Sequence, residues 1–142
     1  ILAWLGAAYG TEEYARNTEL GRKEAEALSY MTSEVHATYG GHFAPGNFAD
    51  SKDAQEEVKR KTYEKLDGQY RWLNDNVKES GGDWYLGKRS FADTFLYVLT
   101  RWLDQTPLKI EGYPALKAFR EKMEADECVR KALQRQDMEP IG

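Results

Sequence analysis

The chemistry open to this sequence depends first on its histidines and its cysteine, the side chains that most often bind metals or act in nucleophilic catalysis. There are two histidines, His36 and His42, and one cysteine, Cys128. The histidines have no cysteine or carboxylate at a metal-ligand spacing, so we expect no metal site. One is expected in a helix and the other in a loop, which gives no basis for a serine–histidine–acid triad. Cys128 follows Asp126 and Glu127, whose charges oppose a thiolate although a helix start favours one, and we expect it to be inert.

Two aromatic side chains remain as candidates for a binding site. His36 lies near the end of a long predicted helix, in the segment Ser33-Glu34-Val35-His36. A lone histidine on a helix is commonly a surface or structural residue, and that interpretation stays open. Trp102 lies in an apolar run, where a tryptophan can pack in a core without any other function. The residues alone therefore leave both a structural and a functional role open.

Two long helices precede the segment that carries Trp102. Apolar residues recur at spacings of three, four and seven from Thr18 to Tyr39, which predicts a helix. We expect Gly40-Gly41 to end it, because glycine tolerates the left-handed turn past a helix end. After a loop from 42 to 50, a second helix is predicted from Ser51 to Ser80, ended by Gly81-Gly82, and the two should form an antiparallel pair. The inward residues of the first helix are Leu20, Ala27, Leu28, Met31 and Val35, and its solvent-exposed ones are Lys23, Glu24 and Glu26.

The stretch from Ser90 to Asp104 is predicted to be the central helix. Ser90 and Asp93 have the spacing of a capping box, in which the Ser90 hydroxyl accepts from the backbone N–H of Asp93 and the Asp93 carboxylate accepts from that of Ser90. A helix that is apolar all round is surrounded by protein, so we expect this one to be fully enclosed in a bundle. The apolar residues that lie on almost every side of it are Phe91, Ala92, Phe95, Leu96, Val98, Leu99, Trp102 and Leu103.

The remaining segments complete an all-α fold. A helix is predicted from near Pro114 and another from Glu127 to Gln136, followed by a tail from 137 to 142. With the two long helices and the central one, this gives a five-helix bundle around a buried central helix. Residues 1–10 are apolar and start without a cap, so they form either a frayed terminal segment or the end of a preceding domain, and we favour the second.

The segment around the central helix resembles the sixth helix of the glutathione transferase family. The resemblance rests on Trp84-Tyr85-Leu86-Gly87, on Ser90-x-x-Asp93 and on the apolar run to Arg101-Trp102, with the other predicted helices in family order. Arg89 and Thr94 depart from the family, since they replace the apolar pair that usually packs across the helix start. The resemblance implies that residues 18–142 are the helical C-terminal domain, 11–17 the linker, and 1–10 the last helix of an N-terminal thioredoxin-like domain.

The resemblance also implies a site. In bacterial members of the beta class, a histidine at the position of His36 faces the glutathione thiol, where it would stabilise the thiolate, and a tryptophan at the position of Trp102 lines the electrophile pocket. The lysine that often follows the histidine is Ala37 in this sequence, so the second anchor is absent. Further substrate-binding residues are expected one or two turns away on adjoining helices: Tyr30, Ser33, Glu34, Tyr97 and Arg101.

Composition limits the partners. A net charge of −4 without a basic cluster argues against a nucleic-acid partner. No apolar run approaches the roughly 20 residues that span a bilayer, so we expect no membrane partner. A single cysteine fits the reducing cytoplasm.

The resemblance predicts that the full-length parent is a glutathione transferase, a cytoplasmic homodimer with a role in detoxification. It would conjugate glutathione, its co-substrate, to small hydrophobic electrophiles and would need no cofactor. The thiol-activating residue would belong to the thioredoxin-like domain, so this chain alone is expected to be inactive. Two alternatives stay open: a non-catalytic binding or assembly module of the same fold, and a free-standing helical interaction domain.

Overall fold

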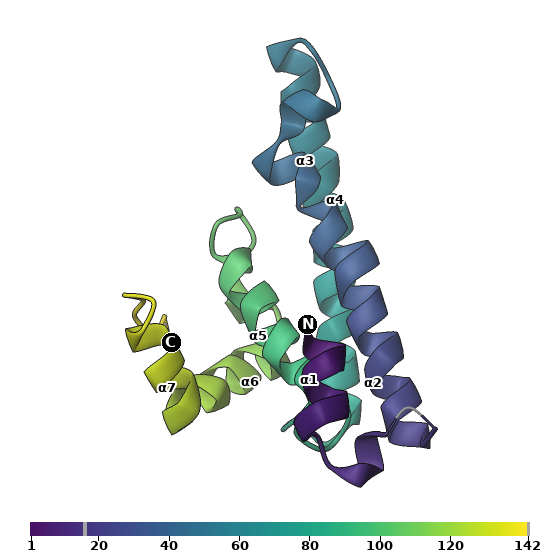
Figure 1. Ribbon diagram of the computed structural model, residues 1–142. Coiled ribbons are helices and arrows are strands. Elements are labelled where there is room, and N and C mark those ends of the chain that lie inside the picture. The colour runs from purple at the N-terminus through teal and green to yellow at the C-terminus, as the bar shows by residue number, and fades with distance from the viewer. Residues whose placement is uncertain (16, 142) are drawn as a thin grey trace.

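The computed structural model describes residues 1–15 and 17–141, and these residues form helices and loops without a strand, as the all-α prediction requires (Figure 1). Arg16, in the expected linker, and Gly142, at the end of the tail, lie outside the described residues. The α-helices are α1 (Leu2–Tyr9), α2 (Glu19–Tyr30), α3 (Gly40–Phe43), α4 (Lys52–Glu79), α5 (Phe91–Leu103), α6 (Pro114–Ala125) and α7 (Glu127–Gln134). A π-helix, η2 (Met31–His36), follows α2, and the 3₁₀ turns are η1 (Glu12–Tyr14), η3 (Pro45–Asn47) and η4 (Ile110–Gly112).

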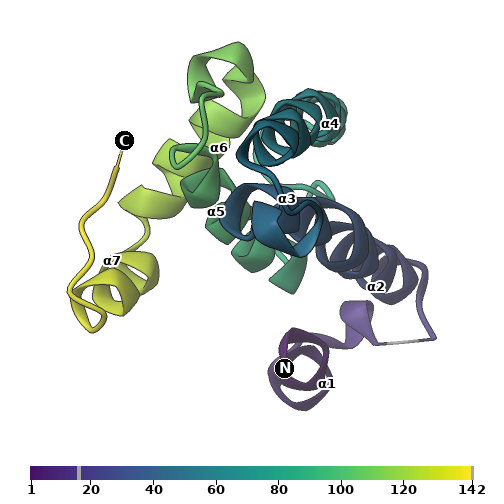
Figure 2. The same ribbon diagram turned by 90° about the horizontal axis from the view of Figure 1, so that it is seen from above.

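The helices pack as two long rods with four shorter helices, α1, α5, α6 and α7, beside them. The segments α2, η2 and α3 form one nearly continuous rod that runs antiparallel to α4 (Figure 1). Seen from above, α5 lies between α2 on one side and α6 on the other, and α7 follows at the far side of α6 (Figure 2). Counting the first rod as one helix, the described residues contain six helices rather than five, because 1–10 also contain α1.

Most predicted helix boundaries are confirmed by their caps. Thr18 Oγ1 accepts from the Gly21 N–H at 3.0 Å at the start of α2, and Ser51 Oγ accepts from the Ala54 N–H at 3.3 Å at the start of α4. Gly81 and Gly82 end α4 with φ values of 103° and 82°, the left-handed region that glycine adopts without strain.

Gly40 and Gly41 do not end their helix, so that part of the prediction is wrong. Neither has a positive φ, and the rod continues to Phe43 before Ala44, the residue preceding Pro45, leaves the helical conformation. The structure gives Gly41 a different role, because a Cβ at this position would lie 2.0 Å from Thr62 Oγ1 and 3.4 Å from Val58 Cγ1. At Gly41 the first rod and α4 therefore approach so closely that there is no room for a side chain.

We expect Gly41→Ala to lower the free energy of unfolding by about 1–3 kcal/mol, because the new methyl group overlaps Thr62. Urea unfolding followed by circular dichroism measures the change. Gly68→Ala is the matched control, since Gly68 lies inside α4 with nothing within 4 Å of its added Cβ. That variant should be more stable by about 0.5–1 kcal/mol. A stable Gly41→Ala protein would show that the two rods separate easily at this point.

The π-helix keeps the buried face of the first rod in line. Its inward residues Ala27, Met31, Val35 and Tyr39 recur every four residues, which overshoots the 3.6-residue turn of an α-helix. The wider i→i+5 turn of the π segment absorbs this overshoot, so that the four side chains remain directed at α4 and α5. Because the π segment ends at His36, it also sets the direction in which that imidazole projects.

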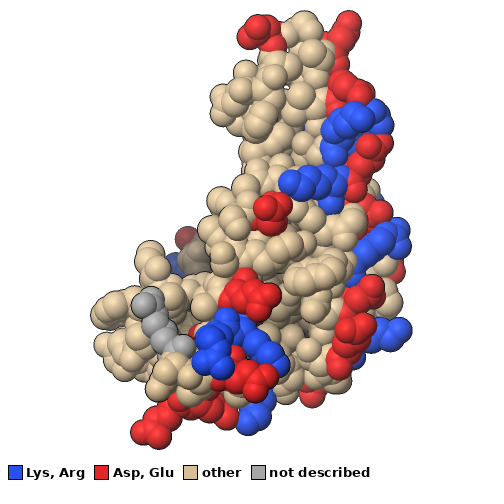
Figure 3. All heavy atoms as spheres, turned by 90° about the vertical axis from the view of Figure 1, so that its right-hand side faces the viewer, with Lys and Arg blue, Asp and Glu red and all other residues tan. Residues whose placement is uncertain are grey.

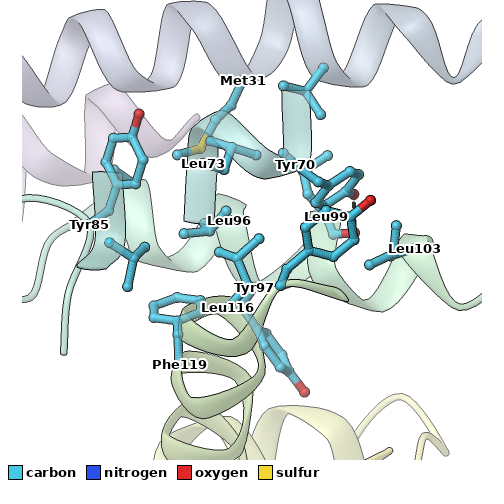
Figure 4. Close-up of a cluster of buried hydrophobic side chains, with 14 of the residues drawn as sticks. Met31, Tyr70, Leu73, Tyr85, Leu96, Tyr97, Leu99, Leu103, Leu116 and Phe119 are labelled. Carbon is cyan, nitrogen blue, oxygen red and sulfur yellow. Dashed lines mark hydrogen bonds between the residues drawn. The ribbon is translucent and has the colours of Figure 1, made fainter. Parts of the chain in front are cut away.

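The core forms where the first rod, α4, α5 and α6 meet. Met31, Leu73 and Leu96 from three of these helices face one another, and Leu116 and Phe119 of α6 close the layer below α5 (Figure 4). Each of these five residues is 0% exposed, so water is excluded from the centre of the bundle. The outer face of the bundle carries acidic and basic side chains interspersed along one edge, over α4 (Figure 3).

The central helix α5 is not enclosed on every side, so the prediction that it is fully enclosed in the bundle is wrong. Thr94 is exposed and Val98 is 38% exposed, and both lie on the face of α5 turned away from α2 and α4. The apolar pattern could not show this, because a valine on an open face has the same letter as one in the core.

None of the described helices has the length and hydrophobicity needed to cross a bilayer.

Candidate functional site

His36 and Trp102 lie side by side, although 65 positions separate them in the numbering. Their ring centroids are 5.1 Å apart with planes inclined at 34°, and the Phe95 ring centroid lies 6.2 Å from that of the imidazole. His36 is exposed, and no hydrogen bond joins its ring nitrogens to any described residue. The imidazole is therefore held by ring packing alone, with its nitrogens available to a ligand.

A chain of aromatic side chains fixes the indole of Trp102. Tyr39 and Phe43 meet it edge to face, with centroids 5.2 Å and 5.4 Å away. The Tyr70 hydroxyl donates to the Leu99 carbonyl at 2.6 Å, so the Tyr39 hydroxyl, 2.7 Å away, is the donor to Tyr70. Burial raises the pKa of both phenols, which keeps them protonated as this chain of donors requires.

The other side of Trp102 borders a cavity between α5, α7 and the C-terminal tail. Its volume is about 780 Å³, in the range of pockets that hold drug-sized ligands. Its walls are largely apolar, and two arginines, Arg89 and Arg101, also line it. The lining residues on α5 include Thr94, Val98 and Trp102, those on α7 include Val129 and Leu133, and those on the tail are Met138 and Ile141.

Tyr97 and Arg101 also border this cavity, but their polar groups are engaged with Glu124 of α6. The Tyr97 hydroxyl donates to Glu124 Oε1 at 2.9 Å, and an Arg101 nitrogen lies 3.1 Å from the same oxygen. Arg101 also donates to the Glu139 carbonyl of the tail at 2.9 Å. Burial raises the pKa of the Tyr97 phenol, so it acts as a neutral donor. These two residues hold the cavity wall together.

The capping box fixes the start of α5 and therefore the position of Trp102. Both arms are present, and Asp93 Oδ2 accepts from the Ser90 N–H at 2.7 Å despite the short side chain. Asp93 Oδ1 also accepts from the Tyr85 N–H at 2.8 Å, which ties the preceding loop to the helix. Burial, opposed by these hydrogen bonds, raises the pKa of the Asp93 carboxyl above its ordinary value. Arg89, at the position of the missing staple, pairs with Asp126 at 2.7 Å instead.

Glu24 is a second anion at this helix start, and its expected place in solvent was wrong. It is 6% exposed, and its Oε1 accepts from the Phe91 N–H at 2.8 Å. A carboxylate at a helix N-terminus satisfies an otherwise unpaired donor and interacts favourably with the helix dipole. No local sequence pattern indicates this contact, because Glu24 and Phe91 are brought together only by the packing of α2 on α5.

The other predicted site residues lie elsewhere. Tyr30 packs against Trp72 of α4, with ring centroids 4.3 Å apart, and Ser33 donates to the Ser29 carbonyl of its own helix. Glu34 pairs with Lys65 of α4 at 3.5 Å. No contact among the described residues brings these three side chains to Trp102 or to the cavity, because they project from other faces of the rod.

The remaining candidate residues of the sequence are also placed. His42 Nδ1 lies 3.0 Å from the Tyr63 hydroxyl, and burial lowers the pKa of this histidine. Cys128 is exposed at the start of α7, at the edge of the cavity. Among the described residues no group of three or more histidines, cysteines or carboxylates could hold a metal ion.

The chain belongs to the family described as the glutathione S-transferase C-terminal domain, which it matches over residues 22–127. The matched range begins in α2 and ends at the first residue of α7, so it contains the paired rods, the capped central helix and both His36 and Trp102.

Particular relatives agree with this membership. Glutathione S-transferase GstA of Escherichia coli O157:H7 is 29% identical over 112 residues, which cover 78% of this chain and 51% of that protein. This chain therefore spans about half the length of the curated relative that it matches. A glutathione S-transferase structure from Xylella fastidiosa superposes with a TM-score of 0.78 at 26% identity, covering 85% of this chain and 58% of the other.

Two further structures share the fold. A glutathione transferase homologue from Sulfitobacter, solved with bound glutathione, has a TM-score of 0.71 at 22% identity and covers 83% of this chain and 62% of its own. A ternary complex of BphK, a bacterial glutathione S-transferase, has a TM-score of 0.65 at 23% identity, over 87% of this chain and 58% of its own.

Proposed function

We propose that this chain is the helical half of a longer glutathione transferase, which conjugates the glutathione thiolate to small hydrophobic electrophiles. In this proposal residues 18–142 form the C-terminal domain, 11–17 the linker, and 1–10 the end of a thioredoxin-like domain that holds most of the glutathione. Family membership and the glutathione bound to the Sulfitobacter homologue support it. So does the coverage of about half of GstA.

The observation that carries the proposal is the exposed imidazole of His36 packed on Trp102 at 5.1 Å. A ring nitrogen that no described residue engages can donate a hydrogen bond to the sulfur of bound glutathione. Such a bond favours the thiolate, which is the nucleophilic form of the thiol. Trp102 touches both His36 and the apolar cavity, so an electrophile on its indole would lie beside that sulfur.

The electrophile site in this proposal is the cavity beside Trp102. Trp102 and Val98 offer a flat apolar wall, and Tyr97 and Arg101 support it through Glu124. Tyr30, Ser33 and Glu34 are left out of the proposed wall, because their contacts are with α4 and with their own helix. We further propose that the parent is a cytoplasmic homodimer with a role in detoxification, and that glutathione is its co-substrate without an added cofactor.

The 142-residue chain alone should not accelerate the conjugation of glutathione to 1-chloro-2,4-dinitrobenzene above the uncatalysed rate, because the proposed thiol-activating residue lies outside it. Absorbance of the conjugate measures the rate, with the full-length parent as the positive control. Catalysis by the chain alone would contradict the division of the site between two domains. An inactive parent that still folds would instead favour the non-catalytic binding module.

A further inference from the structure

A buried carboxylate holds the C-terminal tail in place. Glu124 lies in the last turn of α6 and is 7% exposed, a position where a negative charge also opposes the helix dipole. The Ile141 N–H lies 3.1 Å from its Oε1 and 3.0 Å from its Oε2, while Tyr97 and Arg101 bind Oε1. One buried side chain thus joins α5, α6 and the tail.

The tail is directed to this carboxylate by the way α7 ends. Asp137 has a φ of 51°, and the Met138 N–H donates to the Leu133 carbonyl at 3.0 Å, the arrangement of a Schellman motif. The chain therefore reverses after α7 and returns toward α5. A residue that precedes proline, as Glu139 precedes Pro140, favours an extended conformation. The Glu139 carbonyl accepts from Arg101 at 2.9 Å.

This path places two tail side chains in the wall of the cavity. Met138 and Ile141 both line it, and they are 39% and 41% exposed, so more than half of each side chain surface is covered. Val98 and Trp102 line the same cavity from α5. Without the tail, the cavity would lose this wall and become an open groove between α5 and α7.

Stability alone does not account for such a network. A buried ion pair contributes little net stability compared with apolar residues of the same volume, although removing one partner is costly. Burying Glu124 and Arg101 is thus an expensive way to strengthen the bundle, but it fixes the tail through hydrogen bonds to its backbone at Glu139 and Ile141. The accepting oxygens hold the Ile141 N–H, and the Ile141 side chain lines the cavity.

We propose that Glu124 is a positioning residue that sets the size of the apolar site by latching the tail across it. The latch admits compact aromatic ligands and excludes larger ones, with Met138 and Ile141 as the residues that determine the limit. This inference rests on the proposed function in taking the cavity as the electrophile site, but the latch itself requires neither glutathione nor catalysis.

Two fluorescent probes of different size test the latch on the 142-residue chain. The compact probe is 1-anilinonaphthalene-8-sulfonate, and the larger one is its dimeric form, bis-ANS. The variants are Glu124→Gln, which removes the charge, and Met138→Ala with Ile141→Ala, which removes the wall while leaving Glu124 intact. In each variant the ratio of the dissociation constant of the compact probe to that of the larger probe should rise by about fivefold, equivalent to about 1 kcal/mol. Combining the three substitutions should add nothing, because the latch acts only through the wall.

Glu121→Gln is the matched control. Glu121 is an exposed glutamate on the same helix, paired with Lys117, and its replacement should leave both dissociation constants unchanged. The Ile141 amide proton reports the latch directly, since its slow hydrogen exchange should be lost in Glu124→Gln and kept in Glu121→Gln. If Glu124→Gln does not fold, the tail variant decides alone, because its substitutions lie outside the core cluster.

Three results would overturn the proposal: no binding of the compact probe to the unmodified chain, an unchanged probe ratio in the tail variant, or additive effects of the latch and tail substitutions. Failure of the proposed function looks different. An inactive full-length parent with the probe results as expected would refute transferase activity and leave the latch standing.

Discussion

Asp93→Ala should lower the free energy of unfolding of this chain by about 2–5 kcal/mol. Asp93 is 1% exposed and accepts from the N–H groups of Ser90 and Tyr85 at 2.7 Å and 2.8 Å. Its removal leaves the buried Tyr85 N–H and the partly buried Ser90 N–H without this acceptor, and each costs about 1–3 kcal/mol. Urea unfolding followed by far-ultraviolet circular dichroism measures the loss.

Asp126→Ala is the control for this substitution. Asp126 also caps a helix, accepting from the N–H groups of Cys128 and Val129 at 2.8 Å and 3.2 Å, but its side chain is partly exposed, at 23%. Water can replace it there, so we expect a loss of about 1 kcal/mol. Equal losses of unfolding free energy in the two variants would show that burial does not increase the contribution of the capping box to stability.

The raised pKa of Asp93 adds a dependence on pH with a defined sign. Because burial raises the folded-state pKa above its ordinary value of 3.8, the folded chain holds this proton more tightly than the unfolded chain. The contribution of Asp93 to stability is therefore greatest below pH 3.8 and declines as the pH rises through the folded-state pKa. The stability of the unmodified chain relative to Asp93→Asn should decline over the same range, and a difference that grew with pH would contradict this assignment.

Local signals in the sequence predicted the fold well. The caps at Thr18, Ser51 and Ser90 and the glycines at 81 and 82 specify helix ends through hydrogen bonds and backbone angles that involve only near neighbours. Gly41 shows the limit of such signals. Glycine is favoured both at a helix end and where two helices touch, and only the position of Thr62 on the other rod distinguishes these uses.

The site was predicted less completely, for a related reason. The sequence indicated His36 and Trp102 through the family resemblance, and the structure brings them together. Glu24 and Glu124 were missed because each is a glutamate on an amphipathic helix, where an exposed position is the usual outcome. Their partners, the Phe91 N–H and the Ile141 N–H, are backbone donors far along the chain, and a sequence pattern does not encode such contacts.

His36→Ala in the full-length parent should lower kcat/KM for glutathione conjugation by about 100-fold, the scale of losing one preorganised hydrogen bond to a developing or resident anion. The imidazole is exposed and has no hydrogen bond to the described residues, so the free energy of unfolding should change by less than about 0.5 kcal/mol. Conjugation of 1-chloro-2,4-dinitrobenzene at varied glutathione concentration provides the rates.

The pH profile separates a thiolate contact from a packing role. If His36 donates to the glutathione sulfur, its removal raises the pKa of the bound thiol, and the rate of His36→Ala should recover as the pH is increased. His36→Asn keeps a neutral hydrogen-bond donor, so its pH profile should lie between those of the unmodified parent and of His36→Ala. His42→Ala is the matched histidine control: it loses the contact with the Tyr63 hydroxyl at 3.0 Å, so it should cost stability while leaving the profile unchanged. A loss in His36→Ala that was equal at every pH would assign the imidazole to support of Trp102, since ring packing does not depend on the protonation of the thiol.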